Sequence, residues 1–330
     1  MNIKETFNHV ICTLGLVMLV ATPALAQKPP TKRVAVMLAP TQDAFVGTWS
    51  ATFKAESAAR GIDASIFSSP FDAALQARQI DDAVSQKFDG LVVQALSLNA
   101  IIPSLTRAKA AGIPVLAVIS QMPESASPLI VSYVGEDSRR LGELAGEAMA
   151  NALKAAGKPK GRIAAVTGSL ADAIAPMRLD GFKASLKRLA PEATIVAVED
   201  VRWNPVAAEQ AAGQVLARFA ASGGIDGLYG MNDRLANAAI QAAGAAGYKV
   251  GSKDKGIIVV GGNCQAVGMQ NLAAGDMAAT VEMLPKVSAT LAARVFQEVL
   301  AGKAVNKNYL EQHRIITQAN IAQVRSACSY

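Results

Sequence analysis

Histidine and cysteine are scarce in this chain of 330 residues, and their scarcity excludes several classes of protein. The sequence has two histidines and three cysteines, and one of each lies within the first 26 residues. Beyond that segment, any Ser-His-Asp or Cys-His system would depend on His313, and a metal site would lack its commonest nitrogen ligand. We therefore expect no catalytic residues, no metal and no cofactor, and we interpret His313 as a hinge or segment-end residue.

The remaining cysteines, Cys264 and Cys328, are too few for a scaffold held together by disulfides. Export from the cytoplasm would permit a bridge between them. Nothing in the sequence requires one, however, and we favour two unpaired thiols.

Motifs of the common enzyme classes are also missing. The chain has no GxGxxG after a strand, no GxxxxGK[ST], no GxSxG and no HExxH. Hydrolysis by two carboxylates leaves no motif, because the two side chains can come from any loops. An exported carboxylate-based hydrolase therefore stays open as an alternative.

Charge is modest and scattered, with 18% charged residues and a net charge of +6. The densest basic group, Lys154, Lys158, Lys160 and Arg162, straddles an expected helix-to-strand turn and has few aromatic neighbours. A nucleic-acid surface would combine a basic face with a recognisable binding motif. We interpret this group as a solvated turn and expect no nucleic-acid partner.

The first 26 residues have the pattern of a secretory signal peptide. Lys4 lies in a short polar lead, residues 10–21 are mostly apolar, and Ala24 and Ala26 are the small residues that signal peptidase reads. We expect cleavage after Ala26 and a soluble protein in the periplasm. Cys12 lies inside the apolar run, which argues against a lipoprotein anchor, and no later stretch has the about 20 apolar residues of a membrane span.

Apolar residues make up 51% of the chain, enough for large cores, and the length suggests two domains. Short β-branched runs alternate with alanine-rich segments of helical period, which predicts an α/β fold with mainly parallel sheets buried on both faces. The expected strands are RVAVML, DASIF, DGLVVQAL, IPVLAVI, LIVSYV, GRIAAVTG, ATIVAVED, IDGLYGM and GIIVVGG.

These strands form two sets, residues 32–133 and 162–262, which predict two doubly wound lobes. Ligands of such sheets collect at the carboxyl ends of the strands. The loops expected to carry function therefore follow Leu38, Val93, Ile119, Thr167, Gly230 and Gly261.

The loop sequences carry a resemblance that periodicity does not show. VMLAPTQDAFVGTW, IPVLAVISQ, PMRLDGF, VRWNP, YGMNDRLA, VVGGN and AATVEMLP resemble, in order and spacing, periplasmic sugar-binding proteins of the ribose-binding type. The resemblance covers residues 32–321. It implies a type I periplasmic binding protein fold, in which two lobes are joined by a hinge of three crossovers. The implied lobes are residues 32–135 with 284–311, and residues 136–283 with 312–330.

The resemblance also implies a function. Such a protein captures a sugar-like molecule by lobe closure and delivers it to the permease of an ABC importer in the inner membrane, and we expect a monomer. A sensor that presents the ligand to a membrane receptor would use the same closure and stays open as an alternative.

Several ligand-binding roles follow from matching positions. Phe45 and Trp203 stand where relatives stack aromatic rings on the sugar. Arg178 stands where relatives have an arginine that donates two hydrogen bonds to sugar oxygens. The alternative for Arg178 is a surface ion pair with Asp180. Asn232 is expected to hydrogen-bond the ligand, with Asp233 capping the following helix. For Asp43, ligand contact and helix capping stay open.

Four positions depart from the family pattern. A common Asp-Arg pair is replaced by Ile119 and Ser120, an aspartate by Asn263 and a hinge glutamine by Met283. A buried hydroxyl without a partner costs about 1–3 kcal/mol, so the ligand should carry fewer hydroxyls than a common hexose or pentose. Gln94 and Glu282 are expected to compensate in part. The predicted ligand-binding residues are Asp43, Phe45, Gln94, Ser120, Arg178, Trp203, Asn232 and Asn263.

Overall fold

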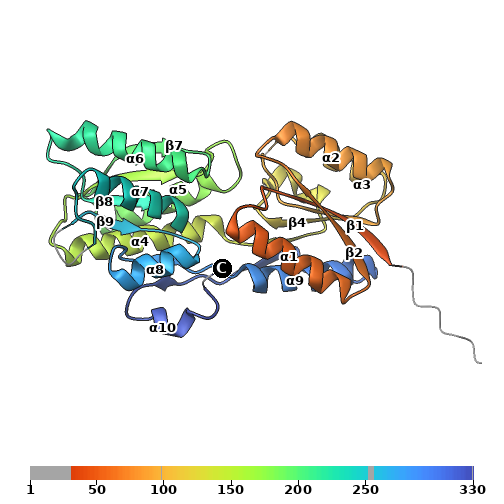
Figure 1. Ribbon diagram of the computed structural model, residues 1–330. Helices are drawn as coiled ribbons and strands as arrows, with labels where there is room; N and C mark the ends of the chain where they lie inside the picture. The colour runs from red at the N-terminus through yellow and green to blue at the C-terminus, as the bar shows by residue number, and fades with distance from the viewer. Residues whose placement is uncertain (1–30, 98, 252–255, 329) are drawn as a thin grey trace, which may run out of the picture. The chain divides into compact units, whose positions relative to one another are not determined.

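The computed structural model describes residues 31–97, 99–251, 256–328 and 330 (Figure 1). The expected signal peptide and its cleavage site lie outside these residues. Within the described ranges, no helix is long and apolar enough to cross a membrane.

The first sheet has six parallel strands in the order β11-β5-β4-β3-β1-β2. Its central strands are buried over their whole length because helices cover both faces. The strands are β1 (Lys32–Leu38), β2 (Ile62–Ser68), β3 (Gly90–Val93), β4 (Val115–Ile119), β5 (Ser132–Gly135) and β11 (Asn308–Leu310).

Successive residues of β1 point to opposite faces of this sheet, as the pleat of a strand requires. Val34 and Val36 pack in the core that holds Trp49 of α1 (Ala44–Ala58) and Phe296 of α9 (Pro285–Leu300). Ala35 and Met37 instead pack with α2 (Ala73–Ser85) and α3 (Ile102–Ala110). Figure 1 shows these two helix pairs on opposite sides of the sheet. A 3₁₀ helix, η1 (Glu124–Leu129), precedes β5.

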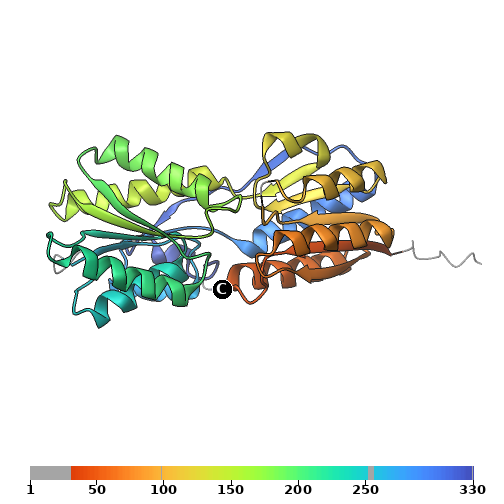
Figure 2. The same ribbon diagram turned by 90° about the horizontal axis from the view of Figure 1, so that it is seen from above.

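The second sheet has four parallel strands in the order β7-β6-β8-β9. They are β6 (Arg162–Thr167), β7 (Thr194–Asp200), β8 (Gly227–Gly230) and β9 (Ile258–Val260). Helices again cover both faces (Figure 2). The helices are α4 (Ser138–Ala155), α5 (Ala175–Leu189), α6 (Pro205–Ala220), α7 (Asp233–Ala245), α8 (Ala266–Ala274) and α10 (Ile321–Val324).

The chain passes between the two sheets three times. It leaves the first sheet after β5 and enters α4, which packs against α5. It returns from β10 (Thr280–Val281) to α9, which packs on α1, and it leaves again between β11 and β12 (Ile315–Ile316), which pairs antiparallel with β10. Two doubly wound parallel sheets joined by three crossovers are the fold that the sequence predicted, whereas the predicted lobe boundaries stay a prediction.

Cys264 and Cys328 form a disulfide, so the expectation of two unpaired thiols is wrong. The residues are 64 positions apart in the sequence, but the turn after β9 and the segment after α10 bring their Cα atoms within 5.2 Å. That distance lies within the range a disulfide spans. Sequence separation alone gave no sign of this proximity, which arises from the return of the chain after the third crossover.

Candidate ligand-binding site

A cavity of about 350 Å³ lies where loops from both sheets meet. Its size is near the lower end of the about 300–1,000 Å³ typical of small-molecule sites. Most of its residues follow the carboxyl ends of strands, as expected for parallel sheets. All eight predicted ligand-binding residues line it: Asp43, Phe45, Gln94, Ser120, Arg178, Trp203, Asn232 and Asn263. Their contact with a ligand stays a prediction.

The two aromatic residues come from different sheets. Phe45 is the second residue of α1 and is nearly buried, whereas Trp203 lies in the loop between β7 and α6. The indole N–H of Trp203 donates to Oδ2 of Asp172 at 2.6 Å, which fixes the ring plane. The rings of Phe45 and Trp203 are both candidates for contact with the apolar C–H groups of a ligand.

Gly168 is required for the position of Trp203. A Cβ added to Gly168 would lie 1.9 Å from Cε2 of the indole. The ring therefore rests directly on the backbone at the end of β6. Trp203 itself has a φ of 62°, an uncommon conformation for a bulky residue that strained functional loops often contain.

Arg178 makes a buried ion pair that the sequence did not predict. Its Nε and Nη2 atoms donate to the two carboxylate oxygens of Glu136 at 3.1 and 2.6 Å. Nη1 donates to the carbonyl of Met231 and to Oδ1 of Asn263, and Nη2 also lies 3.2 Å from the sulfur of Met283. The guanidinium thus has a protein acceptor for each of its five N–H donors.

The surface ion pair with Asp180 that was the alternative for Arg178 is therefore wrong. Arg178 is 2% exposed and its carboxylate partner, Glu136, is 1% exposed. Burial alone would lower the pKa of Arg178, but the Glu136 carboxylate outweighs burial and raises it. In this geometry the guanidinium predicted to hold ligand oxygens is held instead by Glu136 and Asn263, and its contact with a ligand stays a prediction.

The capping of α7 also differs from expectation. Asn232, not Asp233, is the N-cap, and its Oδ1 accepts from the N–H of Leu235 at 2.9 Å. Asp233 is the first helical residue and is fully buried, where it accepts from Thr280 Oγ1 and the Gln265 N–H, each at 2.7 Å. Burial raises the pKa of Asp233 to about 7.

The polar groups left facing the cavity are mainly donors. The side-chain oxygens of Gln94, Asn232 and Asn263 already accept from protein groups, so their amide N–H₂ groups are what they offer a ligand. Ser120 adds a hydroxyl. The cavity carboxylates are engaged as well, because Asp172 accepts from Trp203 and from the N–H groups of Ile174 and Ala175. Among the described residues, no group of three or more His, Cys, Asp or Glu side chains is placed to hold a metal ion.

The departures from the family pattern lie at the cavity. Ile119 and Met283 both line it and are 3% and 2% exposed, respectively. Gln94 lines it too, as its predicted compensating role requires. Glu282 does not: its carboxylate accepts from Arg314 at 2.8 Å, and its main-chain carbonyl lies 3.0 Å from Nδ1 of His313. The predicted compensation by Glu282 is therefore wrong.

Sequence reasoning missed four charged residues that line the cavity. They are Glu136, Asp172, Arg202 and Arg234. Glu136 directly follows β5, so the rule that function gathers at the carboxyl ends of strands would have pointed to it. Arg234 follows Asn232 in the first turn of α7 and pairs with Asp43.

The family described as periplasmic binding protein domain matches residues 34–304. The chain belongs to this family. Its members are binding proteins of the periplasm. A curated relative, the xylitol-binding protein of Mycolicibacterium smegmatis, is 24% identical over 250 residues, or 76% of this chain and 67% of the relative.

Solved structures confirm the periplasmic binding protein fold. A galactofuranose-binding protein is 19% identical and superposes with a TM-score of 0.82 over 91% of this chain and 100% of its own. An ABC transporter solute-binding protein from Mycobacterium smegmatis with bound glycerol is 24% identical, with a TM-score of 0.80 over 91% of this chain and 99% of its own.

Proposed function

We propose that this periplasmic binding protein captures a polyol or a sparsely hydroxylated sugar and delivers it to the permease of an ABC importer. The observation that carries the proposal is the cavity of about 350 Å³ whose walls come from both sheets. A ligand held by both walls favours the closed arrangement, since only contacts made there can shift the equilibrium towards it.

The two sheets are the cores of the two lobes in this proposal. Residues 32–135 with 284–311 form one lobe, and residues 136–283 with 312–330 form the other. The three crossovers then act as the hinge. His313 lies in the third crossover, between β11 and β12, where its Nδ1 contacts the carbonyl of Glu282.

The lining of the cavity supports a ligand with few hydroxyls. Ile119 and Met283 give it an apolar wall in addition to the aromatic rings. Its amide groups are donors that suit the oxygen atoms of a small polyol or a deoxy sugar. The curated relative is named for xylitol and a solved relative holds glycerol; the small size of these polyols agrees with the cavity, whereas their hydroxyl on every carbon does not support the apolar wall.

The remaining parts of the proposal concern location and partners. We infer that residues 1–26 direct export and are cleaved after Ala26. The mature protein then works in the periplasm as a monomer, with a permease in the inner membrane as partner. Lobe closure would serve a ligand sensor equally well. Growth of a permease-deletion strain on the ligand separates the two functions, because loss of growth indicates import.

A thermal-shift screen tests the ligand class directly. The panel contains xylitol, glycerol, L-fucose, L-rhamnose, ribose and glucose, and a bound ligand at 100 times its dissociation constant adds about 2.7 kcal/mol of stability. We expect a polyol or a deoxy sugar to raise the melting temperature of the parent protein more than that of Trp203→Ala. NMR should recover the ligand unaltered after prolonged incubation. A shift with glucose or ribose alone contradicts the ligand class, and ligand breakdown supports the hydrolase alternative.

A further inference from the structure

Tyr330 lies behind two walls of the cavity without lining the cavity itself. Its ring meets Phe45 edge-on, with the ring centroids 6.0 Å apart. Its hydroxyl donates to the main-chain carbonyl of Asn263. Phe45 belongs to α1 on the first sheet, whereas Asn263 follows β9 of the second, so one side chain contacts a cavity residue from each sheet.

Asn263 lies in a strained turn. Asn263 has a φ of 85°, which asparagine tolerates, but Cys264 has a φ of 51°, a conformation that a cysteine adopts only where its surroundings impose it. The turn directs Oδ1 of Asn263 to Nη1 of Arg178 at 3.1 Å. The position of the Asn263 amide in the cavity therefore depends on whatever holds this turn.

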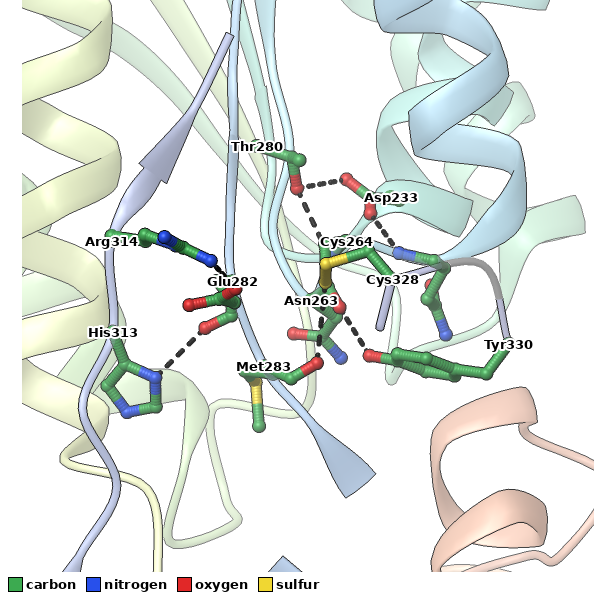
Figure 3. Close-up of a disulfide and its surroundings, with 11 residues drawn as sticks. Asp233, Asn263, Cys264, Thr280, Glu282, Met283, His313, Arg314, Cys328 and Tyr330 are labelled. Carbon is green, nitrogen blue, oxygen red and sulfur yellow. Dashed lines mark hydrogen bonds and ion pairs between the residues drawn. A yellow bond between two sulfur atoms is a disulfide. The ribbon is translucent and has the colours of Figure 1, made fainter. Parts of the chain in front are cut away.

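The N–H of Asn263 donates to the carbonyl of Val281 at 2.8 Å, and four further groups hold the turn, which Figure 3 shows around the disulfide. Cys264 is bonded to Cys328, and its N–H donates to Oγ1 of Thr280 at 3.3 Å. Asp233 accepts from Thr280 and from the residue that follows Cys264. Tyr330 supplies the fourth contact through its hydroxyl, and its main-chain oxygen accepts from the N–H of Ala266 at 3.2 Å.

The disulfide is the covalent part of this arrangement. Tyr330 is two residues beyond Cys328, and two residues span at most about 7 Å of extended chain. The bond between Cys328 and Cys264 therefore confines Tyr330 to the immediate neighbourhood of Asn263.

We propose that Tyr330, anchored by the Cys264–Cys328 disulfide, is a positioning residue that sets Phe45 and Asn263 relative to each other. The ring edge restrains Phe45, and the hydroxyl restrains the Asn263 turn. The pKa of Tyr330 is raised well above its ordinary value, mainly by burial and also by the nearby carboxylates Asp233 and Asp43, so the hydroxyl remains a donor. The proposed effect on ligand affinity rests on the proposed function of the cavity.

Hydrogen exchange measured by mass spectrometry tests the proposal without any ligand. We expect Tyr330→Ala to speed exchange both in the first turn of α1 and in residues 263–268. Tyr330→Phe keeps the ring and loses the hydroxyl, so it should speed exchange only in residues 263–268. The double variant Cys264→Ser/Cys328→Ser should reproduce the pattern of Tyr330→Ala, because it releases the anchor.

Tyr248→Ala is the matched control. Tyr248 packs against the same core of the second sheet as Tyr330, but it follows α7, which starts at the cavity and runs about 20 Å away from it over its 13 residues. It should change exchange in neither segment. If Tyr330→Ala speeds exchange in residues 263–268 alone, Tyr330 stabilises only the second sheet and the proposal is overturned. If the double cysteine variant leaves both segments unchanged, the anchoring by the disulfide is overturned.

Calorimetry with xylitol as the probe then measures the consequence for binding. We expect a dissociation constant about three- to tenfold higher for Tyr330→Ala, with Tyr330→Phe intermediate and Tyr248→Ala like the parent. Parent-like affinity in Tyr330→Ala overturns the positioning role. A parent protein that does not bind xylitol counts against the proposed ligand class, while the exchange experiment still decides the role of Tyr330.

Discussion

Nη1 of Arg234 lies 2.6 Å from Oδ2 of Asp43, and this ion pair joins the first turn of α7 to the N-cap of α1. The same carboxylate accepts from the N–H groups of Phe45 and Val46 through Oδ1. Of the two roles considered for Asp43, helix capping is confirmed and ligand contact stays a prediction; its carboxylate also meets a cation from the second sheet. The pair is a contact that opening of the lobes would break.

Substitutions at Asp43 and Arg234 separate the two roles of Asp43, which are capping of α1 and pairing with Arg234. Asp43→Asn keeps the cap, because asparagine caps as well as aspartate, and it removes the charge. The pair is partly exposed and worth about 0.2–1 kcal/mol, so Asp43→Asn and Arg234→Gln should each weaken ligand binding by about two- to fivefold. Calorimetry at low and high salt should show that the difference in ligand affinity between the parent and each variant becomes smaller at high salt.

The matched control for the ion pair is Arg218→Gln. Arg218 pairs with Glu199 at 2.7 Å, but both residues belong to elements of the second sheet. This variant should bind like the parent. If the loss of binding free energy in the double variant of Asp43 and Arg234 equals the sum of the losses in the two single variants, the pair does not couple in the ligand-bound state.

A second prediction concerns the buried pair of Arg178 and Glu136. Arg178→Lys replaces a fork of five donors with a point charge, and it leaves acceptors on Glu136, Asn263 and Met231 without partners. We expect the free energy of unfolding in urea to fall by about 3–5 kcal/mol and ligand binding to be lost. The control is Arg314→Lys, whose partner Glu282 lies outside the cavity lining. Parent-like binding by Arg178→Lys would contradict the positioning role of the guanidinium.

Trp203 is the subject of the third prediction. Trp203→Ala should raise the dissociation constant at least about tenfold, because it removes stacking worth about 1.4 kcal/mol. Gly168→Ala should have a similar effect with the indole still present, since the added Cβ would meet Cε2 of the ring. Gly213→Ala is a control with open space at the Cβ position. Unchanged affinity with a normal circular dichroism spectrum would remove Trp203 from the site.

The fold was predictable because its signals are local. The β-branched runs around β1, β4 and β6 mark strands buried on both faces, whatever surrounds them. The cavity residues were predictable as a group, since a parallel sheet collects the loops after its strands. Trp203 stands in such a loop and Phe45 in the first turn of the helix that follows one, and both line the cavity.

Individual partners were not predictable, because they depend on distant segments. Glu136 and Arg178 are 42 residues apart, and Asp43 and Arg234 are 191 apart. Reasoning from nearby residues offered Asp180 as the alternative ion-pair partner of Arg178 and assigned helix capping to Asp233. The structure assigns capping to Asn232 and directs Asp233 to Thr280, since the turn after β9 buries its carboxylate.

One buried and one half-buried carboxyl group, Asp233 and Glu311, predict an unusual dependence of stability on pH. Burial raises the pKa of Asp233 and of Glu311 to about 7, well above their values in an unfolded chain. The folded state therefore retains protons that the unfolded state releases, so the free energy of unfolding should decrease as pH rises from about 4 to 7. Above the folded pKa the loss is complete.

Urea unfolding between pH 4 and pH 8 measures this dependence. Asp233→Asn and Glu311→Gln should each flatten the curve, because a neutral amide releases no proton. Asp63→Asn, at an exposed position on β2, should leave the slope as in the parent. A slope that persists in both Asp233→Asn and Glu311→Gln would show that other groups titrate on unfolding.

The last prediction concerns Ile119, one of the four positions expected from the sequence to depart from the family pattern. Ile119 is 3% exposed and has a φ of 62°, a genuine outlier for a β-branched residue. Its carbonyl accepts from the hydroxyl of Tyr133 at 2.9 Å, which helps to hold this conformation. We expect its side chain to face an apolar part of the ligand.

Two substitutions separate the backbone from the charge. Asparagine and aspartate both tolerate a positive φ, so Ile119→Asn and Ile119→Asp should relieve strain equally. Only Ile119→Asp places a carboxylate against the apolar edge of a deoxy sugar, which should cost several kcal/mol of binding or raise the pKa of the new carboxyl group. With glucose or ribose, the same carboxylate gains hydroxyl partners and should strengthen binding. Calorimetry with both ligand classes on the parent and the two variants tests the apolar contact at Ile119. If the parent binds glucose or ribose tightly and Ile119→Asp weakens that binding, the apolar contact is refuted. The fold and the family are unaffected by that outcome.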